Sequence, residues 1–194
     1  MTLVDDNLPE RAAAGDVGAF AVLVREYSGL VYRVALRMLG AEQAQDASQE
    51  VWIRAWRNIR NFRGESAFGT WLYKVTVNTC LNVLRKERGR EARETGEEPF
   101  AHLPTPPGGE DDPEAATLSR ERMDEVVEAL EGIRAEHRAA VILRHMEGLS
   151  YAEIASILEV PDGTAKGWAS RGRAALLLAL VPESRGNDDA GQSS

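Results

Sequence analysis

The sequence predicts an all-α protein with two small helical domains joined by a flexible acidic linker. In both halves of the chain apolar residues recur at three- and four-residue steps, the spacing of one helix face, and few segments alternate as a strand does. Residues 94–116 hold five of the eight prolines and seven acids without a base, a composition that cannot bury enough apolar surface to fold. We therefore place domains at 1–92 and 120–185, the linker at 93–119 and a disordered tail at 186–194.

Three helices are expected in the N-terminal domain. The first has an apolar face from Phe20 to Met38 and ends at Gly40, because a glycine often follows the last residue of a helix. Amphipathic stretches at about 42–59 and 68–88 predict the second and third helices. A short polar segment, 61–67, connects them.

The C-terminal domain is expected to contain a helix-turn-helix. Apolar residues from Met123 to Ile133 begin its first helical unit. Further on, Ser150 and Glu153 have the spacing of a capping box at the start of a short helix. A tight turn at 158–160 follows, and Pro161 suits the first turn of a helix that continues to about residue 179. Two helices joined by a three-residue turn form this motif.

Charge is unevenly distributed along the chain. The net charge of −8 argues, taken alone, against a nucleic-acid-binding protein. Residues 54–93, however, carry ten Arg or Lys against three Glu, directly before the acidic segment 94–116. Such segregation indicates that the basic block can meet phosphates while the acidic block avoids them.

Signals of enzymatic, metal-binding or membrane function are poor. The three histidines and the single thiol, Cys80, do not form a zinc-binding set, and neither a glycine-rich phosphate loop nor a nucleophile elbow occurs. We therefore expect no enzyme activity, no metal and no cofactor. With neither a secretory signal nor an apolar run of about 20 residues, the chain is predicted to be cytoplasmic and free of membranes.

Two segments could bind DNA. The second helix of the helix-turn-helix carries small polar and basic side chains suited to bases and phosphates, although a hairpin with an exposed basic face would show the same pattern. On the third helix, polar residues at helical steps form a stripe, comprising Lys74, Asn78, Asn82, Arg85 and Arg88. Nearby aromatic residues suit single-stranded DNA. Trp52 and Trp71 are instead expected in the core, whereas Phe62 and the loop after it are expected to be exposed.

The motifs DASQEVWIRAW at 46–56, FRGE at 62–65 and FGTWL at 68–72 closely resemble the −10-binding domain of extracytoplasmic-function bacterial sigma factors. In the second half, LR at 143–144, EGLSYAEIA at 147–155 and PDGTAK at 161–166 resemble the −35-binding domain of the same family. The resemblance covers about residues 16–89 and 120–178, in the same order and across an acidic linker.

The resemblance implies a factor that binds core RNA polymerase, at its clamp helices and flap, and directs promoter-specific transcription initiation. It implies recognition of duplex −35 DNA and of single-stranded −10 DNA, with an anti-sigma factor as a further candidate partner. The polymerase-facing residues would be Asp46, Gln49, Glu50 and Arg54. The −10 DNA would contact Phe62, Arg63, Gly64, Glu65, Ser66, Ala67, Lys74, Asn78, Asn82 and Arg85. The −35 DNA would contact Gly163, Thr164, Lys166, Gly167, Ser170, Arg171 and Arg173.

The expected recognition helix departs from the family pattern. Its inward positions are smaller than usual at Ala165, Ala169 and Gly172, and a glycine inside a helix costs up to about 1 kcal/mol against alanine. Trp168 lies beside this inward stripe, in place of the usual basic residue. We interpret Trp168 mainly as a packing residue; a DNA-reading role is the alternative.

Two other classes of function are compatible with parts of the sequence. A stand-alone helix-turn-helix regulator would bind duplex DNA as a dimer, and an interaction module, such as an anti-sigma or adaptor protein, would bind other proteins. Neither class has use for the helix 46–56 together with the loop 62–67, which favour the sigma factor.

Overall fold

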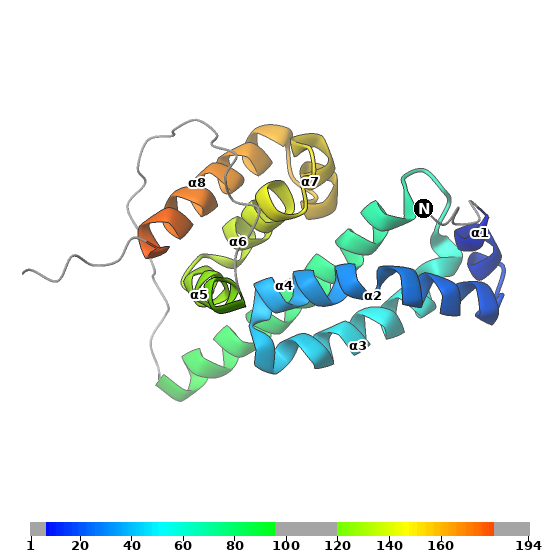
Figure 1. Cartoon of the computed structure of the whole chain (residues 1–194), viewed down its shortest axis with the longest axis horizontal. Coiled ribbons are helices and arrows are strands. Elements are labelled where there is room, and N and C mark those ends of the chain that lie inside the picture. Colours follow the sequence, from blue (N-terminus) through cyan, green and yellow to red (C-terminus); the bar gives the residue numbers. More distant parts are fainter. Residues whose placement is uncertain (1–6, 96–119, 181–194) are drawn as a thin grey trace, which may run out of the picture.

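The computed structural model describes residues 7–95 and 120–180 of the chain, and these residues form helices and short connections without a strand (Figure 1). The N-terminal domain contains α1 (Leu8–Ala13), α2 (Val17–Leu39), α3 (Ala41–Asn58), the 3-10 turn η1 (Ile59–Asn61) and α4 (Phe68–Thr95). The C-terminal domain contains α5 (Arg120–Glu131), α6 (Ala135–Val141), the π-turn η2 (Ile142–Met146), α7 (Tyr151–Leu158) and α8 (Asp162–Leu180). The all-α prediction is confirmed. Most of the predicted linker and all of the predicted tail lie outside the described residues.

A side-chain cap starts α2, and a glycine separates its end from the start of α3. The Asp16 side chain caps α2 by accepting a hydrogen bond from the Ala19 amide at 3.0 Å, and Arg11 pairs with the same carboxylate at 2.8 Å. These hydrogen bonds lower the pKa of Asp16. At the other end Gly40 adopts φ +79°, a conformation that L side chains rarely reach, and α3 starts at the next residue. The expected stop at Gly40 is therefore confirmed.

The C-terminal domain contains the predicted helix-turn-helix. Ser150 accepts from the Glu153 amide, and the Glu153 carboxylate accepts from the Ser150 amide at 2.8 Å, so the predicted capping box is present. The short helix α7 ends at Glu159, which adopts a left-handed conformation with φ 56°. The turn to α8 follows directly. Before α7, the wide turn η2 closes with a hydrogen bond from the Glu147 amide to the Ile142 carbonyl at 3.1 Å.

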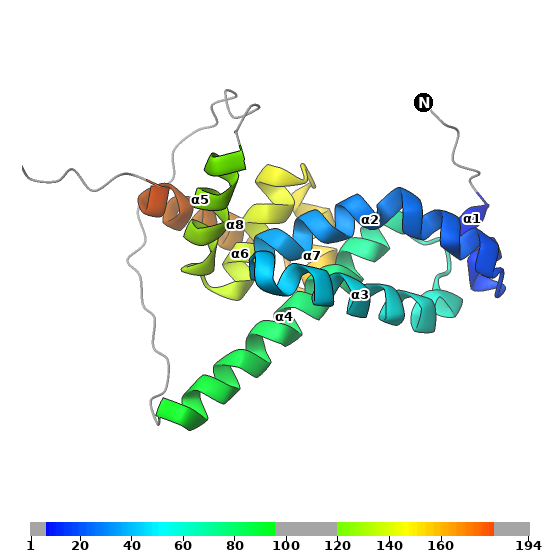
Figure 2. The ribbon, with the colours of Figure 1, turned by 60° about the horizontal axis from the view of Figure 1, so that its bottom comes forward.

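The two domains pack against each other. One apolar core contains Met38 of α2 and Val77 of α4 together with Leu130 of α5 and Ile142 of η2. A second core, within the N-terminal domain, joins α1, α2, α3 and the start of α4. Figure 2 shows that the C-terminal part of α4 projects beyond both cores. The helix continues to Thr95, past the expected end near residue 88. The polar sequence after residue 88 lacks the apolar periodicity from which the helix was predicted.

Candidate nucleic-acid interface

The loop 62–67 lies between η1 and α4 and borders a cavity. Residues 63–67 are exposed, as expected. The cavity has a volume of about 290 Å³ and is lined by Asn61, Phe62, Arg63, Glu65, Ser66 and Trp71. Carboxylate, guanidinium, amide and hydroxyl groups thus surround an opening with aromatic side chains in its wall. This size is close to the lower end of ligand pockets, about 300 Å³.

Phe62 is half-buried, which corrects the expectation that it would be exposed. Its ring centroid lies 5.8 Å from the ring of Phe68 and 5.8 Å from that of Trp71, both in edge-to-face geometry. Phe68 in turn packs on Tyr27 of α2 at 5.2 Å. Such aromatic pairs are favourable beyond the area that they bury. This aromatic cluster fixes the loop to the helical bundle and leaves one side of Phe62 facing the cavity.

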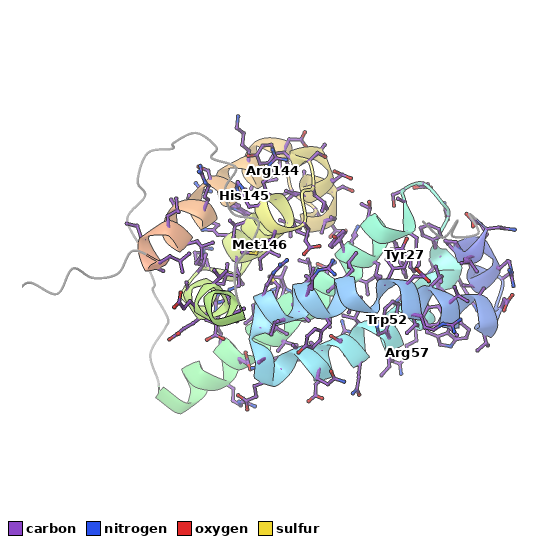
Figure 3. The ribbon with its side chains drawn as sticks, viewed as in Figure 1. Tyr27, Trp52, Arg57, Arg144, His145 and Met146 are labelled. Atoms are coloured by element: carbon purple, nitrogen blue, oxygen red, sulfur yellow. The ribbon has the colours of Figure 1, made fainter. Side chains whose placement is uncertain are left out.

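Trp52 and Trp71 are half-buried and pack against the N-terminal core, which agrees with their expected structural role. Trp52 is labelled in Figure 3. Its ring centroid lies 6.0 Å from that of Phe20 of α2, in edge-to-face geometry. One turn later Trp56 also contacts Phe20, at 4.9 Å, yet remains 39% exposed.

The predicted polar stripe on α4 is partly accessible. Lys74, Asn78 and Asn82 are half-buried, whereas Arg85 is exposed and donates to the Asn82 side-chain oxygen at 2.8 Å. Lys74 is not free, because its ammonium group lies 2.7 Å from the Glu159 carboxylate of the C-terminal domain.

The outer face of α3 presents the predicted polymerase-facing residues. Its inner face is fixed by small or branched residues, Ala44, Ala47, Val51 and Ala55. On the outside Asp46 and Gln49 are exposed, and the Arg54 guanidinium pairs with Glu50 at 2.6 Å. The predicted set did not include Ile53, which also lies on this face and is 46% exposed. An apolar side chain at an outward helical position is the sequence feature that indicates such a surface residue.

The helix α8 separates its inward and outward residues as the sequence predicts. Ala165, Ala169 and Gly172 are buried, while Leu176 is half-buried. The candidate DNA-binding residues divide into an exposed group and a half-buried group. Exposed are Gly163, Lys166, Ser170 and Arg171; half-buried are Thr164, Gly167 and Arg173.

Gly172 allows α8 to lie directly against α6. A Cβ atom at this position would lie 2.5 Å from the His137 carbonyl oxygen and 3.0 Å from Cβ of Val141. The backbone of α6 therefore occupies the volume that a larger side chain would fill. Trp168 is half-buried against the same core, with its ring 6.2 Å from the His137 ring.

Arg144 stabilises the segment that leads into the helix-turn-helix. Arg144 lies in η2 (Figure 3). Its guanidinium carbon lies 4.8 Å from the centre of the Tyr151 ring, and Nη1 donates to the Leu149 carbonyl at 3.0 Å. Both contacts fix the connection between η2 and α7. Arg144 is thus a structural residue of the LR motif at 143–144.

The described residues contain no group of three His, Cys, Asp or Glu side chains that could hold a metal ion. Within 7–95 and 120–180, no helix has the length and apolar character that crossing a bilayer requires.

Two family models and several relatives match this chain. Residues 23–90 match Sigma-70 region 2, and residues 123–176 match Sigma-70, region 4. The RNA polymerase sigma-H factor of Pseudomonas aeruginosa is 37% identical over 182 residues, which cover 92% of this chain and 94% of that protein. The ECF RNA polymerase sigma-E factor of Escherichia coli is 36% identical, over 93% of this chain and 96% of that protein. The chain belongs to the extracytoplasmic-function RNA polymerase sigma factors.

Solved structures of similar fold support the same architecture. The sigma factor RpoE of Bartonella quintana, solved with the anti-sigma factor NepR, matches with a TM-score of 0.65 and 24% identity, over 86% of this chain and 99% of that chain. CnrH, solved with the cytosolic domain of CnrY, matches with a TM-score of 0.67 and 21% identity, over 93% of this chain and 99% of that chain.

The family membership confirms the sigma-factor hypothesis over the stand-alone regulator and the adaptor. The sigma factor directs promoter-specific transcription initiation with RNA polymerase, and its family is one of transcription initiation factors. Region 2 covers most of α2, all of α3 and most of α4, so the aromatic cluster and the cavity fall inside it. Region 4 contains the helix-turn-helix.

Proposed function

We propose that this sigma factor uses three separate surfaces. The outer face of α3 docks on the clamp helices of core RNA polymerase, and the C-terminal domain contacts the polymerase flap. The loop 62–67 and the α4 stripe bind −10 DNA as a single strand. The exposed face of α8 binds the −35 duplex. The cytoplasm, where polymerase and promoter DNA meet, is the expected location, and an anti-sigma factor is a candidate partner.

The cavity beside the loop 62–67 is the observation that carries this proposal. Extruding a base from the duplex costs a few kcal/mol. Stacking on an aromatic ring returns about 1–3 kcal/mol for each base. Phe62 and Trp71 supply rings in the cavity wall, and Arg63, Glu65 and Ser66 supply donors and acceptors for the edge of a base. A site of this composition suits one unpaired base.

The polymerase-facing proposal rests on the mixed character of the α3 surface. Asp46 and Gln49 offer polar groups, while Ile53 offers an apolar contact that is 46% exposed. Protein interfaces typically combine an apolar centre with a polar rim. The inner residues of α3 are packed in the helical bundle, which fixes the position of this outer face before docking.

Charge reversal tests the docking surface. Asp46→Lys should weaken the affinity for core polymerase roughly tenfold or more, since like-charge contacts at an interface are costly. Glu26→Lys changes the same charge at an exposed position of α2 and should leave the affinity unchanged. Fluorescence anisotropy of the labelled sigma factor, titrated with core polymerase, measures both. Equal affinities for the two variants would contradict docking through α3.

Substitutions in the loop test the −10 site. Glu65→Ala and Ser66→Ala should reduce transcription from a duplex promoter while leaving core affinity intact. On a template that is already melted at −10 the reduction should be smaller, because an unpaired base costs least to extrude. Ser28→Ala on α2 is the control, since Ser28 is exposed and its hydroxyl bonds only to the Arg25 carbonyl among the described residues. A loss that is equal on melted and duplex templates would contradict the base-capture role.

The recognition helix is tested on duplex DNA within the holoenzyme. Arg171→Ala should weaken −35 binding by about 1–3 kcal/mol if Arg171 contacts a base, and should relax specificity at one position. If it contacts a phosphate, the salt dependence should instead fall by about one unit. Promoter affinity that is insensitive to this change at every salt concentration would exclude Arg171 from the interface.

A further inference from the structure

A group of basic side chains lies where α6 packs on α8. His137 of α6 is half-buried, with its ring centroid 6.2 Å from that of Trp168 on α8. Its carbonyl oxygen lies against Gly172, so the backbone of α6 approaches α8 directly beside the exposed Arg171. Trp168 and Arg171 are three residues apart and therefore lie on the same side of the helix. His137 and Arg171 thus border one edge of α8.

Arg134, the residue that precedes α6, belongs to the same group. Burial lowers the pKa of His137, and the positive charges of Arg171 and Arg134 lower it further. The two arginines thus act on the imidazole from α8 and from the start of α6. Because the ordinary pKa of histidine is about 6.5, the His137 ring is neutral at pH 7 in this state.

The acid in this group, Glu136, does not neutralise it. Its charge raises the pKa of His137, but less than burial and the arginines lower it. Oε2 of Glu136 lies 3.9 Å from Nη2 of Arg134, which is too far for a hydrogen bond, and the Arg134 side chain is 61% exposed. The same Oε2 atom is buried, on the protein side of the group. Two guanidinium groups and an imidazole therefore converge on one edge of α8, an arrangement that suits an anionic ligand.

The width of the DNA groove identifies this ligand. A helix with its side chains is about 10–12 Å in diameter, and the major groove of B-DNA is about 12 Å wide. A recognition helix therefore fills the groove, and side chains on its edges face the sugar–phosphate backbones rather than the bases. Arg171 lies toward the edge that adjoins α6, where the nearest anion of bound DNA is a phosphate.

We propose that Arg134, His137 and Arg171 form one phosphate-binding site, which holds a backbone phosphate of the −35 duplex at the edge of α8. The inference rests on the proposed −35 role of α8 and adds two residues from outside that helix. The guanidinium groups donate to the phosphate oxygens, and the imidazole joins them once it is protonated. The Trp168 ring beside His137 limits the positions that the imidazole can adopt.

The site makes the affinity for −35 DNA depend on pH. A phosphate beside His137 favours the protonated imidazole and raises its pKa in the complex. Between the pKa of the free protein and that of the complex, binding takes up one proton. The affinity should therefore rise by up to about tenfold per pH unit as the pH falls through the bound pKa, and level off below the free pKa. Arg134 and Arg171 keep their charges throughout this range.

A phosphate scan of the promoter tests the site in the holoenzyme. Single phosphates along both strands of the −35 element are replaced by uncharged methylphosphonates, and the affinity of each duplex is measured. One position should cost the wild type about tenfold, since charge-assisted hydrogen bonds are lost there. In Arg134→Ala the same replacement should cost at most about threefold, because one of the contacts is already absent. Arg25→Ala removes the same charge at an exposed position of α2 and should keep the full loss.

Titrations between pH 8 and pH 6 test the imidazole. His137→Gln cannot take up a proton, so its affinity should lose the rise in acid. His137→Lys carries a fixed charge and should bind tightly at both pH values. His145→Gln removes the other imidazole of the described residues and should keep the wild-type pH dependence. Circular dichroism checks that each variant keeps its helices, and the exposed Arg134 provides the test if a His137 variant does not fold.

The outcomes separate this site from the proposed function. A scan in which no phosphate depends on Arg134, or a pH dependence that His137→Gln leaves unchanged, would overturn the phosphate site. In that case a loss of −35 affinity in Arg171→Ala would still support the proposed role of α8. A wild-type holoenzyme whose affinity is insensitive to replacement of the whole −35 sequence and of its phosphates would contradict both.

Discussion

Gly172 shows how a single residue can determine the packing of a domain. From its intrinsic propensity a glycine inside α8 should cost up to about 1 kcal/mol. In the structure this position is where the α6 backbone approaches, with the His137 carbonyl 2.5 Å from a hypothetical Cβ. Close packing against α6 offsets the conformational cost. The departure at this position is visible in the sequence, but the packing partner, His137, lies 35 residues earlier in the chain and has no local signal.

Gly172→Ala should therefore destabilise the sigma factor, although alanine favours helix formation. Overpacking of this kind costs about 1–3 kcal/mol, which outweighs the gain in propensity. Gly167→Ala on the same helix is the control, because its Cβ would meet only the mobile end of Arg171 at 3.4 Å. Urea unfolding followed by circular dichroism measures both. A Gly172→Ala variant as stable as the Gly167→Ala control would contradict close packing.

Trp168 is predicted to act mainly by packing. Its half-buried ring contacts the C-terminal core and lies near His137, whose own pKa is lowered by burial. Trp168→Arg should lower the free energy of unfolding, and promoter affinity should fall no further than this destabilisation explains. A large change of the preferred −35 sequence without loss of stability would favour the DNA-reading alternative.

At the scale of secondary-structure elements, α7 depends on its capping box. Ser150 and Glu153 satisfy each other's amide groups at the start of a helix with only eight residues. Ser150→Ala should cost about 1 kcal/mol, as measured by urea unfolding at neutral pH. An exposed serine outside any cap, such as Ser28, should tolerate the same change. No difference between Ser150→Ala and Ser28→Ala would mean that tertiary contacts alone hold α7 in place.

The pH dependence of this cap has a defined sign. Hydrogen bonds from the Ser150 hydroxyl and amide lower the pKa of the Glu153 carboxyl in the folded state. The stabilisation from Glu153 is therefore complete above its unfolded pKa and is lost as the pH falls through the lower, folded pKa. The difference in stability between the wild type and Ser150→Ala should accordingly shrink in acid, in urea titrations repeated from pH 7 to pH 3.

Elements with strong local signals could be predicted from the sequence. The capping box, Gly40 and Pro161 act within a few residues, so α2, α7 and α8 begin or end close to the expected positions. Local patterns do not identify α1, which has six residues, or the π-turn η2. Phe62 is half-buried because it packs against the rings of Phe68 and Trp71. These contacts depend on the conformation of the loop, which no local sequence pattern predicts.

At the scale of the whole molecule, the charge pattern of the sequence does not predict the contact between the two domains. Arg33 and Arg37 lie on one face of α2, and their partner Glu147 is more than 100 residues away. Periodicity reveals a helix face that is available for contact, but it does not reveal which remote carboxylate meets it. The predicted site residues on α3 and α8 are exposed or half-buried in this packed state, whereas Lys74 on α4 is bound by Glu159.

The most direct test of the central claim is transcription from a duplex promoter by core RNA polymerase, with and without this sigma factor, followed by mapping of the RNA 5′ ends. We expect core polymerase alone to give no defined start site. The reconstituted holoenzyme should give starts at a fixed distance downstream of common −35 and −10 sequences. Failure to associate with core polymerase, or starts that do not depend on the added protein, would contradict its function as a sigma factor.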